Sequence, residues 1–251
     1  MPSPDAMTQA GRPDLSVVVL CYRAGERARL VAADVASSLV KHGIANYQLV
    51  LVGNYHAGMP DATPEVVREI AAHDPRVVCS AVAKQGMMGW DMRTGLDLAQ
   101  GDRLAILDGD GQILAEDLLR ACQELERGGY DLVKAARVHR GDGLKRKAIS
   151  LGFNVLFRLL FPGLRVRDVN AKPKVMTRAA YERLALESDD WFIDAEIMIQ
   201  ARRLGFRIGE IETDFLPLTG RRSFINLRTV LQFLGNLARY RLREFRRPRD
   251  A

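Results

Sequence analysis

From Leu15 onward, short apolar runs alternate with segments that have the periodicity of amphipathic helices. Residues 15–21 and 47–52 are apolar runs of strand length. Residues 26–41 lie between them and repeat apolar side chains on one helical face, namely Leu30, Val31, Val35 and Leu39. This alternation is typical of chains that build a parallel sheet covered by helices. We therefore expect an α/β fold.

The alternation continues along the chain. Further strands are expected at residues 77–81, 103–107 and 132–135, and further helices at residues 64–72, 91–99, 116–127 and 193–203. Pro64 suits a first helical turn, and Gly128-Gly129 suits a helix end.

One of the apolar runs ends in a polar stretch, Asp108-Gly109-Asp110-Gly111-Gln112. In an extended segment alternate residues lie on one side, so Asp108, Asp110 and Gln112 are expected to point together. The glycines between them let the backbone approach a ligand closely. Oxygen ligands in small number suit Mg²⁺ or Mn²⁺, which share their coordination sphere with substrate phosphates. A diphosphate is the natural partner of such a site.

The alternative for the same stretch is a Gly/Asp turn that caps the strand and starts the next helix. That is the commoner interpretation of an isolated Asp-Gly-Asp-Gly sequence, and the motif alone leaves both open. In parallel sheets, ligands bind beyond the carboxyl ends of the strands. The acidic stretch falls there.

Three further features of the sequence bear on secretion, membrane spanning and the redox state of the cysteines. Residues 1–14 carry three prolines and no long apolar run, so we expect a disordered lead-in and not a secretion signal. No run reaches about eighteen consecutive apolar residues, so no transmembrane helix is expected. Cys21, Cys79 and Cys122 have no pairing or metal spacing. We expect them to be reduced core thiols of a cytoplasmic protein.

Positive charge is concentrated at the end of the chain. Residues 220–251 hold nine arginines and two acids, a net charge of +7, whereas the whole chain carries +6 and residues 1–219 therefore sum to −1. Nucleic-acid binding is one conventional interpretation of a basic tail. The slightly acidic remainder and the lack of a recognised groove-reading motif argue against it, so we expect no nucleic-acid partner.

Several separated motifs carry a resemblance to a known family. In order they are Ser16–Tyr22, Asp108–Gln112, Asp168-Val-Asn-Ala-Lys-Pro-Lys174, Trp191-Phe-Ile-Asp-Ala-Glu196 and Gly220-Arg-Arg-Ser223. With them the chain resembles a family-two glycosyltransferase of the GT-A fold, and is most similar to dolichyl- or polyprenyl-phosphate sugar transferases. The resemblance runs from about residue 15 to about residue 240. It implies a Rossmann-like fold, with a mixed, mostly parallel sheet flanked by helices in a catalytic domain of residues 15–219.

The resemblance also implies roles on the donor side. Asp108 would lie near the ribose and diphosphate of a nucleotide sugar, while Asp110 and Gln112, together with Asp108, would hold the Mg²⁺ or Mn²⁺ that bridges its phosphates. Arg222 and Ser223 resemble the basic segment that closes over the donor diphosphate. The catalytic candidates are Asp108, Asp110 and Asp194.

On the acceptor side, the resemblance places Arg137, Arg146 and Ser150 where such transferases grip the phosphate of a lipid acceptor. Arg146 and Ser150 are four residues apart and would share a helical face. Asp194 and Glu196 occupy the family's acidic acceptor-side motif. The alternative for this pair is a solvated or capping acid in the first turn of a helix, where negative charge is favoured in any case.

The chain departs from the family's pattern around the nucleotide base. Leu20 stands in place of a proline, Tyr22-Arg23-Ala24 in place of a Tyr-Asn-Glu turn, and Gly53-Asn54-Tyr55-His56 in place of paired aspartates and a Gly-Ser turn. Tyr22 and Asn54 are nevertheless donor-binding candidates, and Asn54 and Tyr55 could still hydrogen-bond to or stack on a base. The metal and acceptor sides keep the pattern, which argues for retained transfer chemistry with an altered donor pocket.

Two stretches bear on membrane contact. Residues 145–161 begin with three consecutive basic residues, continue with a long apolar series and resemble the interfacial helices of these transferases. Residues 224–245 repeat apolar side chains at steps of three and four among arginines, which predicts a basic amphipathic helix in the C-terminal segment 220–251. Such a helix can lie in the headgroup region of an anionic membrane. It can equally pack on the domain with a solvated arginine fringe, and both can hold for different halves.

The resemblance therefore implies a metal-dependent, inverting glycosyltransferase that moves a sugar from a nucleotide-diphosphate donor to a membrane polyprenyl phosphate. We expect it in the cytoplasm, peripherally bound to the inner face of the membrane. A lipid phosphate is largely dianionic at neutral pH and needs little help from a general base. The runner-up is a transferase with a soluble acceptor, and a third hypothesis is a catalytically silent nucleotide-sugar or membrane-binding module. The donor sugar and base, the identity of the acceptor and the oligomeric state stay open.

Overall fold

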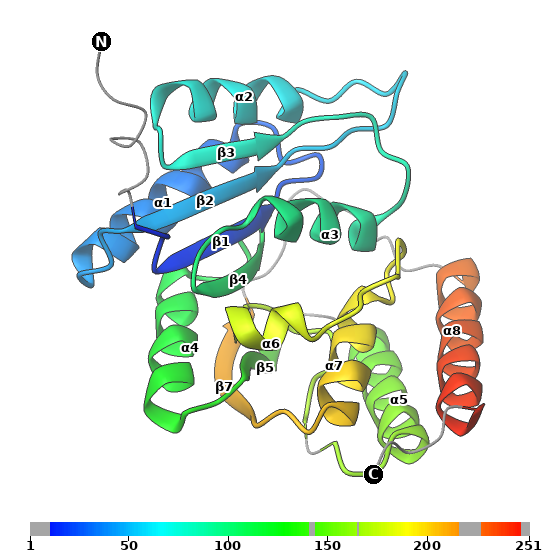
Figure 1. Cartoon of the computed structure of the whole chain (residues 1–251). Helices are drawn as coiled ribbons and strands as arrows, with labels where there is room; N and C mark the ends of the chain where they lie inside the picture. Colours follow the sequence, from blue (N-terminus) through cyan, green and yellow to red (C-terminus); the bar gives the residue numbers. More distant parts are fainter. Residues whose placement is uncertain (1–10, 141–143, 165, 216–226, 247–251) are drawn as a thin grey trace.

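The computed structural model describes residues 11–140, 144–164, 166–215 and 227–246. At its centre is a sheet of seven strands in the order β3-β2-β1-β4-β6-β5-β7 (Figure 1). The strands are β1 (Leu15–Leu20), β2 (Tyr47–Val52), β3 (Val77–Ser80), β4 (Arg103–Asp108), β5 (Leu132–Arg140), β6 (Lys174–Thr177) and β7 (Ile208–Phe215).

Parallel pairing dominates this sheet. β1 pairs in parallel with β2 and β4, β2 with β3, and β5 with β7, whereas β6 is antiparallel to both β4 and β5. The mixed, mostly parallel α/β sheet expected from the sequence is therefore confirmed. Leu20 is in register with both Val52 and Asp108, so β1, β2 and β4 end at one common edge.

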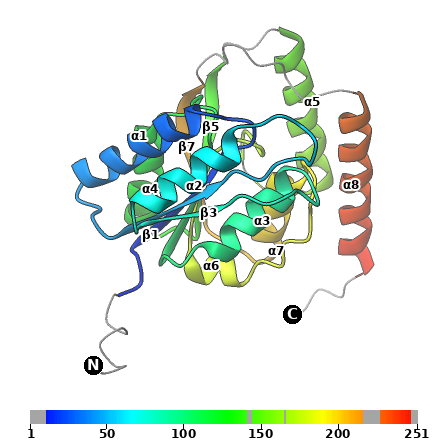
Figure 2. The same cartoon turned by 90° about the horizontal axis from the view of Figure 1, so that it is seen from above.

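Helices cover both faces of the sheet (Figure 2). One face carries α1 (Arg27–Lys41), α2 (Thr63–His73) and α4 (Ala115–Gly128), and the other carries α3 (Met88–Leu98), α6 (Arg178–Glu182) and α7 (Ile193–Arg203). Side chains alternate along a strand, so Val17 and Val19 of β1 join the core under the first group while Val18 and Leu20 join the core under the second. Every side chain of β1 and β2 is buried in this way.

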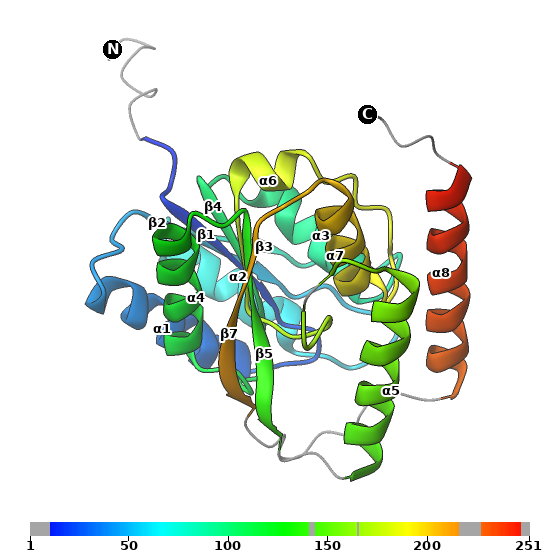
Figure 3. The ribbon, with the colours of Figure 1, turned by 90° about the horizontal axis from the view of Figure 1, so that it is seen from below.

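The remaining two helices, α5 (Leu144–Leu160) and α8 (Leu227–Arg246), lie side by side at one side of the molecule (Figure 3). The rings of Phe153 on α5 and Phe233 on α8 meet edge to face, with centroids 4.7 Å apart. Leu237 of α8 is 1% exposed and belongs to the same core as α7. The middle of the predicted amphipathic helix is thus packed on the domain. Among the described residues, no helix combines the length and the apolar character needed to cross a membrane.

The structure corrects several predicted elements. The strand expected at residues 132–135 continues to Arg140, because β7 supplies pairing partners along its whole length. The helix expected at residues 91–99 begins three residues earlier, at Met88. β6, α6 and β7 were not predicted. β6 has only four residues and begins with a lysine, and β7 contains three acidic residues among its eight, so neither shows the apolar run by which the other strands were recognised.

The three cysteines are free, with Cys21 and Cys122 buried and Cys79 half-buried. Burial raises the pKa of the Cys21 and Cys122 thiols to about 12. The expectation of core thiols is confirmed for these two.

Glycine allows α3 to lie very close to the sheet. A Cβ atom on Gly95 would be 2.4 Å from Cγ1 of Val18 and 2.7 Å from Cγ2 of Val52. We expect Gly95→Ala to lower the free energy of unfolding by about 1–3 kcal/mol through overpacking. Urea denaturation provides the measurement.

Gly235→Ala on α8 is the matched control, because a Cβ there meets no atom within 4 Å. Alanine in an exposed helix interior should raise the free energy of unfolding by up to about 1 kcal/mol. Equal stability changes in the two variants would contradict the close packing of α3 on β1 and β2.

Candidate active site

Four segments that are far apart in the sequence meet at the common edge of β1, β2 and β4. Asp108 is the last residue of β4, and Tyr22 and Asn54 follow β1 and β2. β6 runs antiparallel to β4 with Lys174 opposite Ile106. The residues that precede β6 therefore return to the edge at which β4 ends.

The polar stretch after β4 is a turn and not an extended segment. Gly111 has a φ of +74°, a conformation that glycine adopts without strain, and the backbone N–H of Gln112 donates to Oδ1 of Asp110 over 3.0 Å. A Cβ on Gly109 would lie 2.9 Å from the carbonyl oxygen of Leu20, so this glycine lets the turn pass close to β1. The predicted alternation was wrong, and the turn sets the directions of Asp110 and Gln112.

Asp108 and Asp194 are joined by buried lysines. Nζ of Lys172 lies 2.9 Å from Oδ2 of Asp194 and 3.3 Å from Oδ1 of Asp108, and Nζ of Lys174 lies 2.5 Å from Oδ1 of Asp194. The side chains of Asp194 and the two lysines are at most 3% exposed, whereas that of Asp108 is 32% exposed. Lys174, Asp194, Lys172 and Asp108 thus form one continuous series of ion pairs, which ends with Asp108 at the surface of the site. We call these four residues the ion chain.

The two lysines hold Asp194 as a carboxylate. Burial opposes its charge, but Lys172 and Lys174 outweigh burial and lower the pKa of the carboxyl. Burial also lowers the pKa of Lys174, to about 8, against the attraction of Asp194. For Lys172 burial is outweighed by Asp108 and Asp194, which together raise its pKa. Asp194 is therefore not the solvated acid of the alternative interpretation.

Glu196, the other acid of the predicted pair, fastens a loop. Its carboxylate is fully buried and accepts the backbone N–H groups of Glu187 and Ser188 over 2.9 and 2.8 Å. It also accepts the hydroxyl of Tyr240 on α8 over 2.6 Å. Glu196 thus ties the loop of residues 187–190 to α7 and α8.

On the donor side, Asn54 braces the ends of two strands. It is 1% exposed, and its Oδ1 accepts from the hydroxyl of Ser80 over 2.8 Å and from the backbone N–H of Val82 over 3.1 Å. Its amide donates to Oδ1 of Asp91 over 3.0 Å. The amide therefore supports the loops that follow β2 and β3 from beneath.

An ion pair lies beside Tyr22. Asp91 pairs with Lys84, and both side chains are at most 4% exposed. Nζ of Lys84 lies 4.2 Å from the centroid of the Tyr22 ring, which also meets His56 edge to face at 5.8 Å. Sequence reasoning missed Lys84, Asp91, Lys172 and Lys174 as site residues. A charged residue gives no local signal of burial when its partner comes from another element.

The residues predicted to grip the acceptor phosphate are described only in part. Arg137 forms a bidentate pair with Asp168, with Nε and Nη2 at 2.7 and 2.9 Å from the carboxylate oxygens. Arg146 and Ser150 lie on α5, as the predicted helix requires, but their side chains are outside the described part. Arg222 and Ser223 lie outside the described residues altogether.

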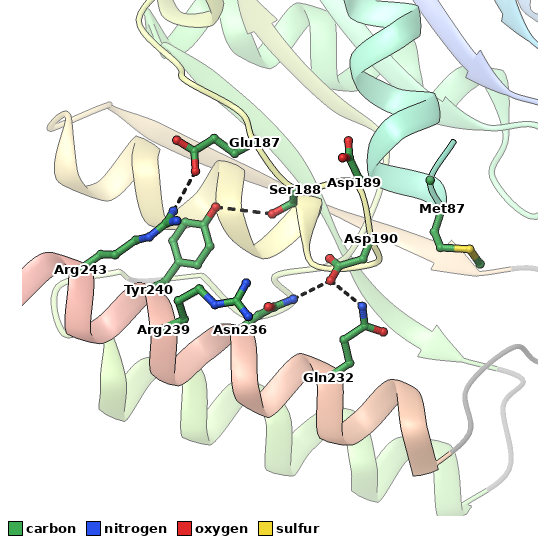
Figure 4. A pocket seen from close by; sticks show the side chains of 11 residues that line it. Met87, Glu187, Ser188, Asp189, Asp190, Gln232, Asn236, Arg239, Tyr240 and Arg243 are labelled. Atoms are coloured by element: carbon green, nitrogen blue, oxygen red, sulfur yellow. Dashed lines mark hydrogen bonds and ion pairs between the residues drawn. The ribbon is translucent and has the colours of Figure 1, made fainter. Parts of the chain in front are cut away.

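A cavity of about 430 Å³ lies between α8, the loop of residues 187–190 and the segment before α3 (Figure 4). Its wall is held by hydrogen bonds from Gln232 and Asn236 to Oδ2 of Asp190, over 2.9 and 2.6 Å. Arg243 donates to Glu187 over 2.8 Å. α8 thus forms one wall of the cavity.

The turn after β4 fits a divalent cation that has few protein ligands. Asp110 and Gln112 offer a carboxylate and an amide oxygen, while Asp108 is tied to Lys172. Within the described ranges, no three His, Cys, Asp or Glu side chains come together as a metal cluster. Mg²⁺ commonly binds through one or two carboxylates and completes its shell with water and substrate phosphates. The residues present match that mode.

Residues 16–189 match the family model described as glycosyl transferase family 2. The chain is similar to the glycosyltransferase AglD of Haloferax volcanii, with 29% identity over 85% of this chain and 35% of AglD. It is also similar to the dolichyl-phosphate beta-glucosyltransferase ALG5A of Trichomonas vaginalis, with 24% identity over 84% of this chain and 68% of that protein. The chain thus spans about a third of the length of AglD.

Among solved structures, the chain is similar to glucosyl-3-phosphoglycerate synthase from Mycobacterium tuberculosis in complex with Mn²⁺, uridine-diphosphate-glucose and phosphoglyceric acid. The TM-score is 0.65 at 20% identity, and the match covers 93% of this chain and 78% of the synthase. This likeness confirms the GT-A fold expected from the sequence.

The ion chain makes stability depend on pH. Asp194→Asn leaves two buried ammonium groups facing a neutral amide, so we expect the free energy of unfolding at neutral pH to fall by about 3–5 kcal/mol. Because the folded pKa of Asp194 is lowered, its ion pairs contribute fully above its unfolded pKa of about 4 and are lost as the pH falls through the folded value.

The difference in stability between the wild type and Asp194→Asn should therefore shrink as urea unfolding is repeated from neutral pH down to about pH 3. Asp34→Asn on the exposed surface of α1 is the control and should show little effect at either pH. A difference that stays constant over this range would contradict the ion pairing of Asp194.

Proposed function

The chain belongs to glycosyl transferase family 2, and from this membership we propose that it transfers a sugar from a nucleotide-diphosphate donor to a polyprenyl phosphate at a membrane surface. The attack is in line, so the anomeric centre is inverted. The observation that carries the proposal is the state of Asp194, whose two carboxylate oxygens each hold a buried ammonium group.

A hydroxyl acceptor needs a base that removes its proton during attack. Asp194 is poorly suited to this task, since its oxygens are engaged by Lys172 and Lys174 and its pKa is lowered. A phosphate monoester has a second pKa near 6 and is largely dianionic at neutral pH, so it attacks without a base. The ion chain therefore supports a phosphate acceptor over a hydroxyl acceptor.

The curated name of ALG5A states a dolichyl phosphate acceptor, which is the same chemical class. We carry this class over to the chain as part of the proposal. The donor sugar is identified by testing a panel of nucleotide sugars.

On the donor side, we assign Asp110 and Gln112 to the cation and Asp108 to the ribose and diphosphate. Mg²⁺ or Mn²⁺, when bound, neutralises the charge that develops on the departing diphosphate. Nη1 of Arg27 lies 3.2 Å from the carbonyl oxygen of Asp110, so a further positive group stands at this turn. Arg222 and Ser223 are assigned to the diphosphate.

The base side is assigned to Tyr22, with Asn54 as its support. Tyr22 has Lys84 against its ring face and His56 at its edge, which fixes the ring without a covalent constraint. A fixed aromatic ring is a platform on which a base can stack. Asn54 acts through the loops that it holds and not through direct contact with the base.

The acceptor side is assigned to Arg137, Arg146 and Ser150. Asp168 accepts hydrogen bonds from Nε and Nη2 of Arg137, which fixes the orientation of the guanidinium group. Charge-assisted hydrogen bonds of this kind are the strong ones in phosphate recognition. Positioning of both phosphates, and not proton transfer, then supplies the rate enhancement.

The helices α5 and α8 are assigned to the membrane. On α5, Leu151, Val155 and Leu159 follow one another at steps of four residues and are 63, 43 and 74% exposed. α8 exposes further leucines in the same way, namely Leu231, Leu234 and Leu242. With the net charge of +7 over residues 220–251, these faces suit the headgroup region of an anionic membrane on its cytoplasmic side.

Release of nucleoside diphosphate tests the function. A panel of nucleotide sugars with Mn²⁺ is incubated with a prenyl monophosphate, with the corresponding prenyl alcohol or with phosphoglyceric acid. We expect release only with the prenyl monophosphate, because the ion pairs of Asp194 make it a poor base for the alcohol and a membrane-borne acceptor needs its prenyl chain. Asp110→Ala should lower the rate by roughly a hundredfold or more, since a group that stabilises the leaving charge is lost.

Glu69→Ala is the matched control, because this acid lies on the exposed face of α2 and pairs with Arg29. It should leave the rate unchanged. Release with the alcohol but not with the monophosphate would overturn the acceptor class, and undiminished turnover of Asp110→Ala would overturn the cation site.

The membrane assignment makes a separate prediction. Leu151→Gln with Leu159→Gln should weaken binding to vesicles of phosphatidylglycerol and phosphatidylcholine by roughly tenfold or more, because burying one leucine stabilises a bound state by about 1.5–3 kcal/mol. Co-sedimentation measures the binding. Leu30→Gln is the control, since Leu30 is 71% exposed but lies on α1. Equal binding of the double variant and the control would contradict the role of α5.

A further inference from the structure

Lys172 stands between the two carboxylates of the proposed site. It precedes β6 by two residues, and β6 is antiparallel to β4 with Lys174 opposite Ile106. Its ammonium meets Asp108 of β4 on one side and Asp194 of α7 on the other. A single side chain thus connects the end of a strand to the start of a helix.

The orientation of this ammonium is fully determined by its neighbours. An ammonium group has three N–H donors. Two point to Asp108 and Asp194 at 3.3 and 2.9 Å, and a third partner, the sulfur of Met88, lies at 3.6 Å. The Lys172 side chain is 3% exposed, so it is a fixed internal charge and not a mobile surface group.

The position of Lys172 has an electrostatic consequence for an incoming anion. With both lysines present, the charges of the ion chain sum to zero. Without Lys172, the same four positions would carry a net negative charge, and the partly exposed Asp108 would have no neighbouring cation from the ion chain. In a poorly solvated site, this net negative charge would strongly repel a phosphate anion that approaches it.

We propose that Lys172 is a positioning residue of the acceptor side, which holds Asp108 and Asp194 together and balances their charge so that an anionic phosphate acceptor can approach the donor sugar. This inference rests on the proposed function and deepens it. The ammonium of Lys172 offsets negative charge on the acceptor side, as the divalent cation does on the donor side. Lys172 acts through Asp108 and Asp194 and does not itself touch the acceptor.

The test compares Lys172→Met, Lys172→Arg and the control Lys134→Met with the wild type. Lys134 is the matched control, because it is also a fully buried lysine with a carboxylate partner, Glu210 at 3.1 Å. It lies opposite Lys174 in the sheet, but its ammonium pairs with Glu210 and not with Asp108 or Asp194. Each protein is assayed for the KM of a prenyl monophosphate, for kcat, and for calorimetric binding of nucleoside diphosphate with Mn²⁺. Urea unfolding checks that each variant folds.

For Lys172→Met we expect the KM of the phosphate acceptor to rise by roughly tenfold or more. The affinity for nucleoside diphosphate with Mn²⁺ should fall by clearly less, because only Asp108 of the two carboxylates is assigned to the donor. Lys172→Arg keeps the charge and should recover most of the loss. Lys134→Met should lower stability without changing either KM or nucleotide affinity. If Lys172→Met does not fold, the double variant with Asp194→Asn removes one charge of each sign. The acceptor KM should still rise, because Asp108 loses its neighbouring ammonium although the net charge of the ion chain stays at zero.

An acceptor KM that stays at the wild-type value in the folded variant overturns the inference. So does an equal loss of nucleotide affinity, or the same rise in KM in Lys134→Met, because each would indicate a general structural effect. A wild type that turns over with the prenyl monophosphate while Lys172→Met is unaffected overturns this inference alone. A wild type that binds nucleoside diphosphate but never uses the phosphate acceptor overturns the proposed function as well.

Discussion

The pairing of Asp194 with Lys172 and Lys174 is the interaction on which the site depends. Burying ions is costly unless each charge has a close partner, and here every buried charge of the ion chain has one. The chain of contacts runs from α7 through the segment before β6 to Asp108 at the end of β4. It therefore fixes the distance between the proposed donor and acceptor sides. It also keeps Asp194 from serving as a general base, and that restriction leads to the proposed acceptor class.

A second set of contacts closes the opposite wall. The loop of residues 187–190 is held by Glu196 from beneath and by Asn236, Tyr240 and Arg243 of α8 from outside. α8 thus connects α5, which is also proposed to face the membrane, to α7, which carries Asp194. Gly53, one of the residues that depart from the family's pattern, has an explanation in packing. A Cβ on Gly53 would lie 2.7 Å from Cγ2 of Val67, so the packing of α2 leaves no room there for a larger residue.

The sequence allowed much of the fold to be predicted, because β1, β2 and α7 follow apolar periodicity and all lie in the buried core. It also pointed to Asp108 and Asp194, through the resemblance of their motifs. It could not reveal that Lys172 and Lys174 are buried, since lysines beside a proline look like surface residues until Asp194, some twenty positions away, is placed against them. For the same reason the sequence did not show that the side chain of Asn54 is buried. Its partners Ser80, Val82 and Asp91 come together only in the folded chain.

We propose that the acceptor attacks through its own negatively charged oxygen, because the ion pairs with Lys172 and Lys174 keep Asp194 from acting as a base. The pH dependence of kcat/KM tests it most directly, measured with a prenyl phosphate and with a fluorinated phosphonate analogue of lower pKa. We expect kcat/KM to fall on the acid side near the second pKa of the acceptor, about 6 for the phosphate. With the analogue this acid limb should move to lower pH. An acid limb that stays at one pH for both acceptors and disappears in Asp194→Asn would show a base on the protein and contradict the account.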